Sequence, residues 1–171
     1  MTQLTYHPAF DPYHQIFRTV RLLMQVAEPF DADKLRVADF YLLFPEKIPT
    51  IRLSRELRSL AKQLKSEPRF PYDRTPNARL LFARMEPTFQ AALQTMFHGS
   101  LLDPKLAQEN VLGLGAGLPE AASMRQRARD ANASEPQLMS FLSKLITEFH
   151  YLGPDGLKAR TALEEHRYDA V

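Results

Sequence analysis

The chain has 171 residues, of which 44% are hydrophobic, and a formal net charge of +2. These values predict a soluble, folded protein with one core or two small cores that share an interface. The lack of cysteine excludes disulfides, thiolate catalysis and cysteine-ligated metal sites, and it fits a reducing cytoplasm. No apolar run approaches the roughly 20 residues that span a bilayer, and the first residues do not resemble a secretory leader. We therefore expect a cytoplasmic protein without a membrane segment.

Positive charge is concentrated in the middle of the chain. Between Arg52 and Arg84, nine basic residues stand against three acidic ones, a local excess of six charges in a chain whose total is +2. The rest of the chain is therefore mildly acidic. This asymmetry would suit a subunit that faces two unlike surfaces, but it also arises without function.

The first two elements are predicted to be helices. Asp11 followed by Pro12 is typical of a helix start, and apolar residues at helical spacing continue until Pro29. A second helix is expected from near Asp33 to the stop at Pro45. Almost every position in its second half is apolar, so this helix should be central in the core.

The basic segment begins with a connection and a helix. Residues 48–53 are short and marked by proline, which favours an extended connection or a short edge strand. An amphipathic helix should follow, with the apolar stripe Leu57, Leu60, Ala61 and Leu64. The other side of this helix is a basic face made of Arg55, Arg58, Lys62 and Lys65. This basic face is either a plain solvated surface or a surface that binds nucleic-acid phosphates or an acidic partner.

Three more helices are predicted in the second half of the chain. The first runs from Pro76 to Gly99 and is kinked or split at Pro87. Residues 125–133 are alanine-rich and charged, so they form either a solvent-facing helix or a partly disordered segment. A clear helical pattern resumes over residues 134–150.

Between these helices lies a segment rich in glycine. Residues 101–118 predict a turn, then a short strand near 110–114, then a flexible loop. We expect a single domain over residues 1–171. If the chain is divided at all, this loop separates residues 1–100 from a C-terminal helical part, 119–171.

The whole pattern predicts a mainly α fold. Short helices, a proline-bounded strand and a glycine turn before a second strand are compatible with a winged-helix core extended by extra helices. A plain helical bundle fits nearly as well. Patterning alone does not separate these two architectures.

No set of residues has the pattern of a catalytic, cofactor or metal site. His7, Asp11 and His14 could ligate a metal, but their spacing does not place both imidazoles on one helical face, and local capping is the better interpretation. Residues 113–117 lack the Gly-Lys-Ser/Thr of a P-loop. The acidic residues and histidine within 164–169 lie near a chain end, where such groups are usually solvated or paired. We expect a protein that is not an enzyme and holds no cofactor.

The two ends of the chain are dense in tyrosine, histidine, arginine and aspartate. Such ends dock on their own body or on another protein. Arginine and tyrosine dominate interface energetics when a partner covers them. The residues that we expect to contact a partner are Tyr13, His14, Arg160, Arg167 and Tyr168. The alternative is that residues 154–171, instead of leaving the core, fold back on the N-terminal block and complete the monomer.

Three blocks carry a family resemblance. They are residues 7–18 (His-Pro-Ala-Phe-Asp-Pro-Tyr-His-Gln-Ile-Phe-Arg), residues 39–45 (Asp-Phe-Tyr-Leu-Leu-Phe-Pro) and residues 153–171, which include Gly-Leu-Lys-Ala-Arg-Thr. Together they resemble the middle component five family of prokaryotic ABC-three-component systems. The chain departs from the expected pattern at one point, where Ala162 follows Thr161 in place of a glycine.

The resemblance implies a small non-enzymatic subunit between an SMC- or ABC-type ATPase and a separate effector, often a nuclease. Such systems act against phages or plasmids, and Lamassu-like defence complexes have this arrangement. The resemblance implies an adaptor that couples the two partners. Together with the helical pattern and the basic middle of the chain, it leads us to expect an α-rich adaptor that touches DNA through that basic middle. Two alternatives stay open at this point, a freestanding winged-helix DNA-binding regulator and a small enzyme with an unrecognised site.

Overall fold

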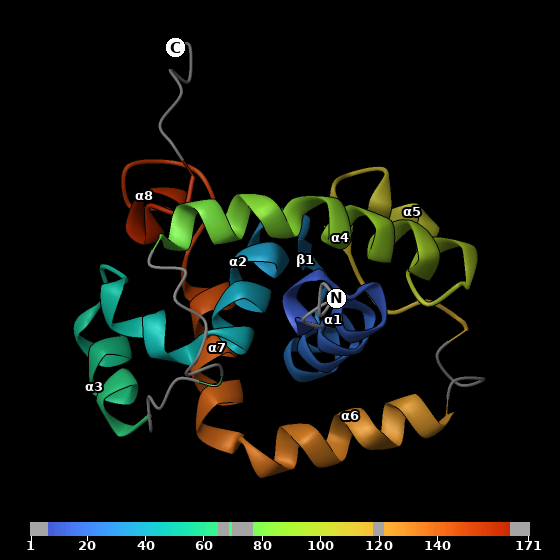
Figure 1. The fold of residues 1–171 in the computed structure, drawn as a ribbon, viewed down its shortest axis with the longest axis horizontal. Helices are drawn as coiled ribbons and strands as arrows, with labels where there is room; N and C mark the ends of the chain where they lie inside the picture. Colours follow the sequence, from blue (N-terminus) through green and yellow to red (C-terminus); the bar gives the residue numbers. More distant parts are fainter. Residues whose placement is uncertain (1–6, 65–68, 70–76, 118–121, 165–171) are drawn as a thin grey trace, which may run out of the picture.

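The computed structural model describes residues 7–64, 69, 77–117 and 122–164, and this part of the chain is mainly α-helical (Figure 1), which confirms the predicted fold class. The helices are η1 (Pro8–Phe10), α1 (Pro12–Val26), α2 (Ala32–Leu43), η2 (Pro45–Thr50), α3 (Arg55–Gln63), α4 (Ala78–His98), α5 (Pro104–Ala107), α6 (Ala122–Ser134), α7 (Pro136–Glu148) and α8 (Leu157–Thr161). Two short strands, β1 (Phe30–Asp31) and β2 (Val111–Leu112), complete it. Within the described residues, no helix is both long enough and apolar enough to cross a membrane.

Helix α1 starts where the capping pattern predicts. The Asp11 carboxylate accepts hydrogen bonds from the amides of Tyr13 (2.8 Å) and His14 (3.1 Å), and Pro12 occupies the first turn, where its missing N–H has no intrahelical partner to lose. The helix ends at Ala27, which adopts the left-handed conformation. Helix α1 lies between α4 and α6 and packs on both (Figure 1).

Helix α2 is the centre of the core, as its apolar composition predicts. Leu35, Ala38, Phe40 and Tyr41 are all fully buried. The Phe40 ring meets the Phe82 ring of α4 edge-on, with 5.6 Å between the centroids. Helices α1 and α7 pack on other sides of α2. A helix surrounded in this way needs apolar residues around most of its circumference, which explains its sequence.

The expected extended connection or strand at residues 48–53 is wrong for its first part, which is the helix η2. The amide of Ile51 donates to the Ile48 carbonyl at 3.0 Å, the i to i+3 bond of a 3-10 helix. Residues three apart in such a helix lie on one face, and both isoleucines are buried there. The apolar spacing thus fits a 3-10 turn as well as a strand.

Of the two expectations for Pro87, a kink or a split, the split is wrong, because helix α4 is continuous from Ala78 to His98. Proline removes the hydrogen bond to the carbonyl of Ala83 and tends to kink a helix. Both Pro87 and Ala83 are exposed, so solvent can satisfy the carbonyl that loses its partner. The missing backbone hydrogen bond at Pro87 is therefore tolerated, because it lies on the exposed side of α4, whose other side is buried.

The short strand near residues 110–114 is confirmed as β2, but its partner was not predicted. Leu112 pairs with Phe30 of β1 in an antiparallel register, and Leu102 forms an isolated bridge with Leu114. The paired strands join distant parts of the chain and do not flank a hairpin, so the winged-helix core is not confirmed. The following loop is held tightly, because a Cβ on Gly115 would lie only 2.4 Å from the Ser100 carbonyl oxygen.

Residues 122–134 form a helix, α6, so the solvent-facing alternative is the one confirmed. Ala128 is fully buried against the body of the protein, while most other side chains of α6 are exposed. The expectation that the C-terminal segment leaves the core is wrong for residues 157–164. Leu157 is fully buried and Leu163 is 4% exposed. This segment therefore completes the core near α2 and α4.

Candidate functional site

The blocks at residues 7–18 and 39–45 meet through a buried ion pair. The Arg18 guanidinium and the Asp39 carboxylate approach to 2.6 Å, although the two residues are only 5% and 1% exposed. Arg18 also donates to the Gln15 side chain at 2.8 Å and to the Pro8 carbonyl at 3.0 Å. These contacts tie η1, α1 and α2 together. Sequence reasoning missed this pair, although both residues lie in the blocks that carry the family resemblance.

His7 and Asp11 serve as local caps, as the sequence suggested. The His7 Nδ1 atom accepts a hydrogen bond from the Ala9 amide at 3.1 Å, and its ring stacks on Phe44 with 6.2 Å between centroids. Asp11 caps α1. In the described part of the chain, no group of three or more histidine, aspartate or glutamate residues is placed to hold a metal ion.

The first turn of α1 presents the predicted partner residues to solvent. Tyr13 is 82% exposed, and His14 and the neighbouring Pro12 are also exposed. Phe10, just before this turn, is 43% exposed. Because Asp11 caps the helix and Arg18 anchors it, the turn is a rigid element that displays an aromatic side chain. Its role in partner binding stays a prediction.

The basic face of α3 is exposed, as the amphipathic pattern predicts. Arg55, Arg58 and Lys62 point to solvent, whereas Leu57 is fully buried. The Arg58 guanidinium contacts only the Leu53 carbonyl, at 3.3 Å, among the described groups. Among the described residues, neither Arg55 nor Lys62 forms an ion pair. Lys65, the fourth predicted member, lies outside the described residues.

Among the described residues, no carboxylate neutralises the charge on this face. The one acidic residue of α3, Glu56, pairs with Lys144 of α7. That pair removes the local carboxylate from the basic face and leaves three cations exposed together. The arrangement can attract a polyanion or an acidic protein surface, and such attraction weakens as salt is added.

The C-terminal segment is pinned to the body by Arg160. Its guanidinium donates to the Arg52 carbonyl at 2.7 Å and lies over the Phe149 ring at 4.3 Å from the centroid. A second hydrogen bond joins the same two residues, since the Arg52 amide donates to the Arg160 carbonyl at 3.0 Å. Arg160 is thus engaged within the chain. Arg167 and Tyr168, the other C-terminal residues expected to bind a partner, lie outside the described residues.

A second charged cluster joins α2 to the same segment. Arg36 lies over the Phe82 ring at 3.9 Å and reaches Glu86 at 2.6 Å and Glu164 at 3.0 Å. Burial, together with the nearby Glu164 carboxylate, raises the pKa of the Tyr151 hydroxyl. The ion pairs of Arg36 therefore hold Glu164 of the C-terminal segment against α2 and α4.

The turn after α8 explains the one departure from the family pattern. Ala162 adopts the left-handed conformation, with φ of 51° and ψ of 28°, and its amide donates to the Lys158 carbonyl at 3.2 Å. This conformation is typical of glycine at the end of a helix. The expected glycine thus corresponds to a real backbone requirement, which Ala162 meets with strain.

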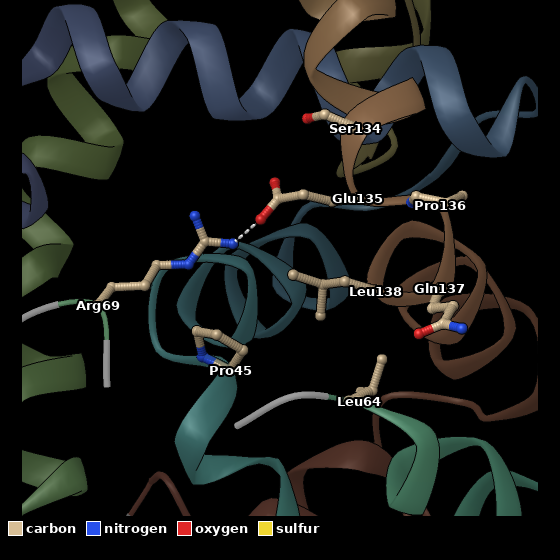
Figure 2. A pocket seen from close by; sticks show the side chains of 8 residues that line it. All are labelled: Pro45, Leu64, Arg69, Ser134, Glu135, Pro136, Gln137 and Leu138. Carbon is tan, nitrogen blue, oxygen red and sulfur yellow. Dashed lines mark hydrogen bonds and ion pairs between the residues drawn. The ribbon is translucent and has the colours of Figure 1, made fainter. Parts of the chain in front are cut away.

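A hollow of about 480 Å³ lies beside the junction of α6 and α7, and Figure 2 shows the side chains around it. Arg69 reaches across it to Glu135, which also binds Arg21 at 2.7 Å. Leu138 lies below this pair, facing Pro45. The carboxylate of Glu135 is shared by two arginines, so these three residues together carry one net positive charge.

Comparison with known proteins supports the resemblance seen in the blocks. The model of the family "ABC-three component (ABC-3C) system Middle Component 5" matches residues 4–169. Neither the curated proteins nor the solved structures contain a match to this chain. The matched range includes the first two blocks, residues 153–169 of the third block, the α3 basic face and the buried Arg18–Asp39 pair. The chain therefore belongs to the middle component 5 family of ABC-three-component systems.

Proposed function

We propose that this chain is a non-enzymatic adaptor that couples an SMC- or ABC-type ATPase to an effector, often a nuclease, in a system directed against phages or plasmids. Membership of the middle component 5 family supports a place within a multi-component system. The coupling itself, the defence role and the identity of the two partners are part of the proposal.

The observation that carries the proposal is the exposed basic face of α3. Within the described ranges, no carboxylate pairs with Arg55, Arg58 or Lys62, and the buried Leu57 anchors their helix. Such a face is arranged to bind a negatively charged surface. We assign to this face the contact with DNA or with an acidic surface of the assembled complex. The energy of such contacts comes largely from charge and is not needed for folding.

We assign a second contact to the two ends of the chain. Tyr13 and His14 are displayed on the first turn of α1, and Arg167 and Tyr168 follow the segment that Arg160 holds in place. In this proposal, Arg160 acts by positioning that segment. A subunit with two chemically unlike contact surfaces has what an adaptor between two partners needs.

The test is assembly with the ATPase and effector encoded beside this chain. We expect the two to co-elute on size-exclusion chromatography only when this chain is present. Changing Arg55, Arg58 and Lys62 together to glutamate should leave the melting temperature nearly unchanged and should weaken the complex or its DNA binding in a salt-dependent way. Changing Gln63 and Ser59 of the same helix to alanine provides the matched control.

Two results would count against the proposal. The first is an ATPase and effector that associate equally well without this chain. The second is turnover of nucleotide or nucleic acid by the purified chain. If the glutamate variant assembles and binds DNA like the natural chain at low salt, the basic face is only a solvated surface.

A further inference from the structure

A groove separate from the surfaces described above lies between the end of α1 and one edge of α6. Its volume is about 500 Å³. Arg125 and Arg129 line one side, while Leu23, Met24 and Leu114 provide apolar surface on the other. We call this feature the α1–α6 groove. It escaped sequence analysis because residues from three distant segments create it.

The two arginines lie on the same edge of α6 because they are four residues apart. Arg127 is on another side of the helix, where it lies 5.7 Å from the centroid of the Phe17 ring. The neighbouring Asp130 carboxylate is held by Gln126 at 2.9 Å. In the part of the chain that the structure describes, neither Arg125 nor Arg129 forms an ion pair.

The floor of the groove is rigid. Asn132 donates to the Arg21 carbonyl at 3.0 Å and accepts from the Arg21 guanidinium at 2.9 Å. Arg21 is 6% exposed and also binds Glu135. These bonds fix α6 against α1, so the spacing between the arginines and the apolar wall is set before any partner arrives.

The charge of the groove is positive overall. The end of α1 contributes a partial negative charge, roughly half an elementary charge, from its last carbonyl groups. The full positive charges of Arg125 and Arg129 outweigh this partial negative charge. The groove therefore selects an anionic group that has apolar surface beside it.

The shape of the groove decides between classes of ligand. Arg129 and Ala27 are exposed, so a small molecule would remain largely in water, whereas sites for small molecules bury most of the ligand surface. A DNA backbone alternates phosphate with deoxyribose and has no aliphatic side chain to place against Met24 and Leu114. A protein segment can place a carboxylate and an aliphatic side chain side by side.

We propose that the α1–α6 groove binds an acidic segment of a partner protein, with a carboxylate between Arg125 and Arg129 and an aliphatic side chain against Met24 and Leu114. The idea extends the proposed adaptor function by specifying the chemistry of one contact. Its test needs only this chain, so it can fail or succeed whatever the fate of the adaptor proposal.

The experiment is a titration of the ¹⁵N-labelled full chain with a capped pentapeptide of aspartate, leucine, glutamate, leucine and aspartate. We expect the amide signals of residues 24–27, 114 and 125–132 to shift. A matched peptide with lysine at the three acidic positions should leave them unchanged. Arg125→Gln with Arg129→Gln should weaken binding at least about tenfold, as expected when two charge pairs are lost.

Two further variants make the result specific. Arg55→Gln with Arg58→Gln, which removes the same charge from α3, should bind the acidic peptide as the natural chain does. Met24→Glu keeps both arginines but places a carboxylate against the peptide, and it should also weaken binding at least about tenfold. Shifts confined to α3, equal binding of the lysine peptide, unchanged binding after the Arg125 and Arg129 changes, or displacement of the peptide by a short DNA duplex would each overturn the proposal.

Discussion

Breaking the buried Arg18–Asp39 pair on one side should destabilise the protein much more than replacing both residues. The carboxylate of Asp39 is 1% exposed and lies 2.6 Å from the guanidinium of Arg18. Arg18→Met leaves that carboxylate buried without its cation, which costs about 3–5 kcal/mol in comparable buried pairs. Asp39→Leu should cost about 3 kcal/mol, because Arg18 keeps its bonds to Gln15 and to the Pro8 carbonyl.

The double variant Arg18→Met with Asp39→Leu should be much closer to the natural chain. It removes both desolvated charges and replaces them with apolar groups of similar size, a change that is often neutral for a buried pair. We expect a loss of about 0–2 kcal/mol, with the remaining cost coming from the Gln15 side chain, which loses its donor. The interaction energy from the cycle should therefore be about 3 kcal/mol or more.

Urea unfolding followed by circular dichroism measures these differences. With a slope of about 2 kcal/mol per molar urea, a loss of 3 kcal/mol lowers the midpoint by about 1.5 M. The total stability of a domain is about 5–15 kcal/mol, so a variant that loses about 3 kcal/mol stays folded in water. Independent, additive effects of the two substitutions would refute the argument that the pair acts as a unit.

Three further predictions address the end of the chain and α2. A chain that stops at Gly153 should be about 3–6 kcal/mol less stable than one that stops at Glu164, because it lacks two buried leucines; equal melting temperatures for the two would contradict the placement of α8 in the core. Ala162→Gly should raise the free energy of unfolding by about 1 kcal/mol, measured in urea, since glycine adopts the left-handed conformation without strain. Burial raises the pKa of the Asp33 carboxyl above 3.8 in the folded protein, so this carboxyl stabilises the fold less as pH rises from 3.8 through the folded pKa. Asp33→Asn removes that titration, so the variant should gain stability relative to the natural chain over the same pH interval. A constant difference between the urea midpoints of the variant and the natural chain would disprove this.

Local signals were sufficient for the elements whose ends and faces are set by neighbouring residues. Asp11 and Pro12 define the start of α1 because a cap acts within one turn. The apolar run in α2 predicts burial because it leaves no polar side for solvent. Leu57 and Arg58 of α3 separate to the buried and exposed sides, as helical spacing requires.

Features that depend on distant residues were not predictable in the same way. Strand β1 exists because Phe30 meets Leu112, and two residues carry no strand pattern by themselves. The spacing of Ile48 and Ile51 suits both a strand connection and a 3-10 turn, so only packing decides. Arg125 lines a groove only because α1 and the loop that contains Leu114 form the other parts of the wall.

The blocks that carry the family resemblance are therefore mainly the parts that hold the frame together. Arg18 and Asp39 join two of the blocks across 21 positions of sequence, and Arg160 joins the third to the connection before α3. Buried charges and helix ends leave strong marks in a sequence because a single substitution there leaves a buried charge or a backbone group without its partner. Exposed contacts leave weaker marks, since the solvated face of any helix carries charges such as Arg55 and Arg129. The residues that hold the fold together can accordingly identify the family from a single sequence. The surfaces that bind partners can be located only in the fold, which shows which exposed charges have no ion-pair partner among the described residues.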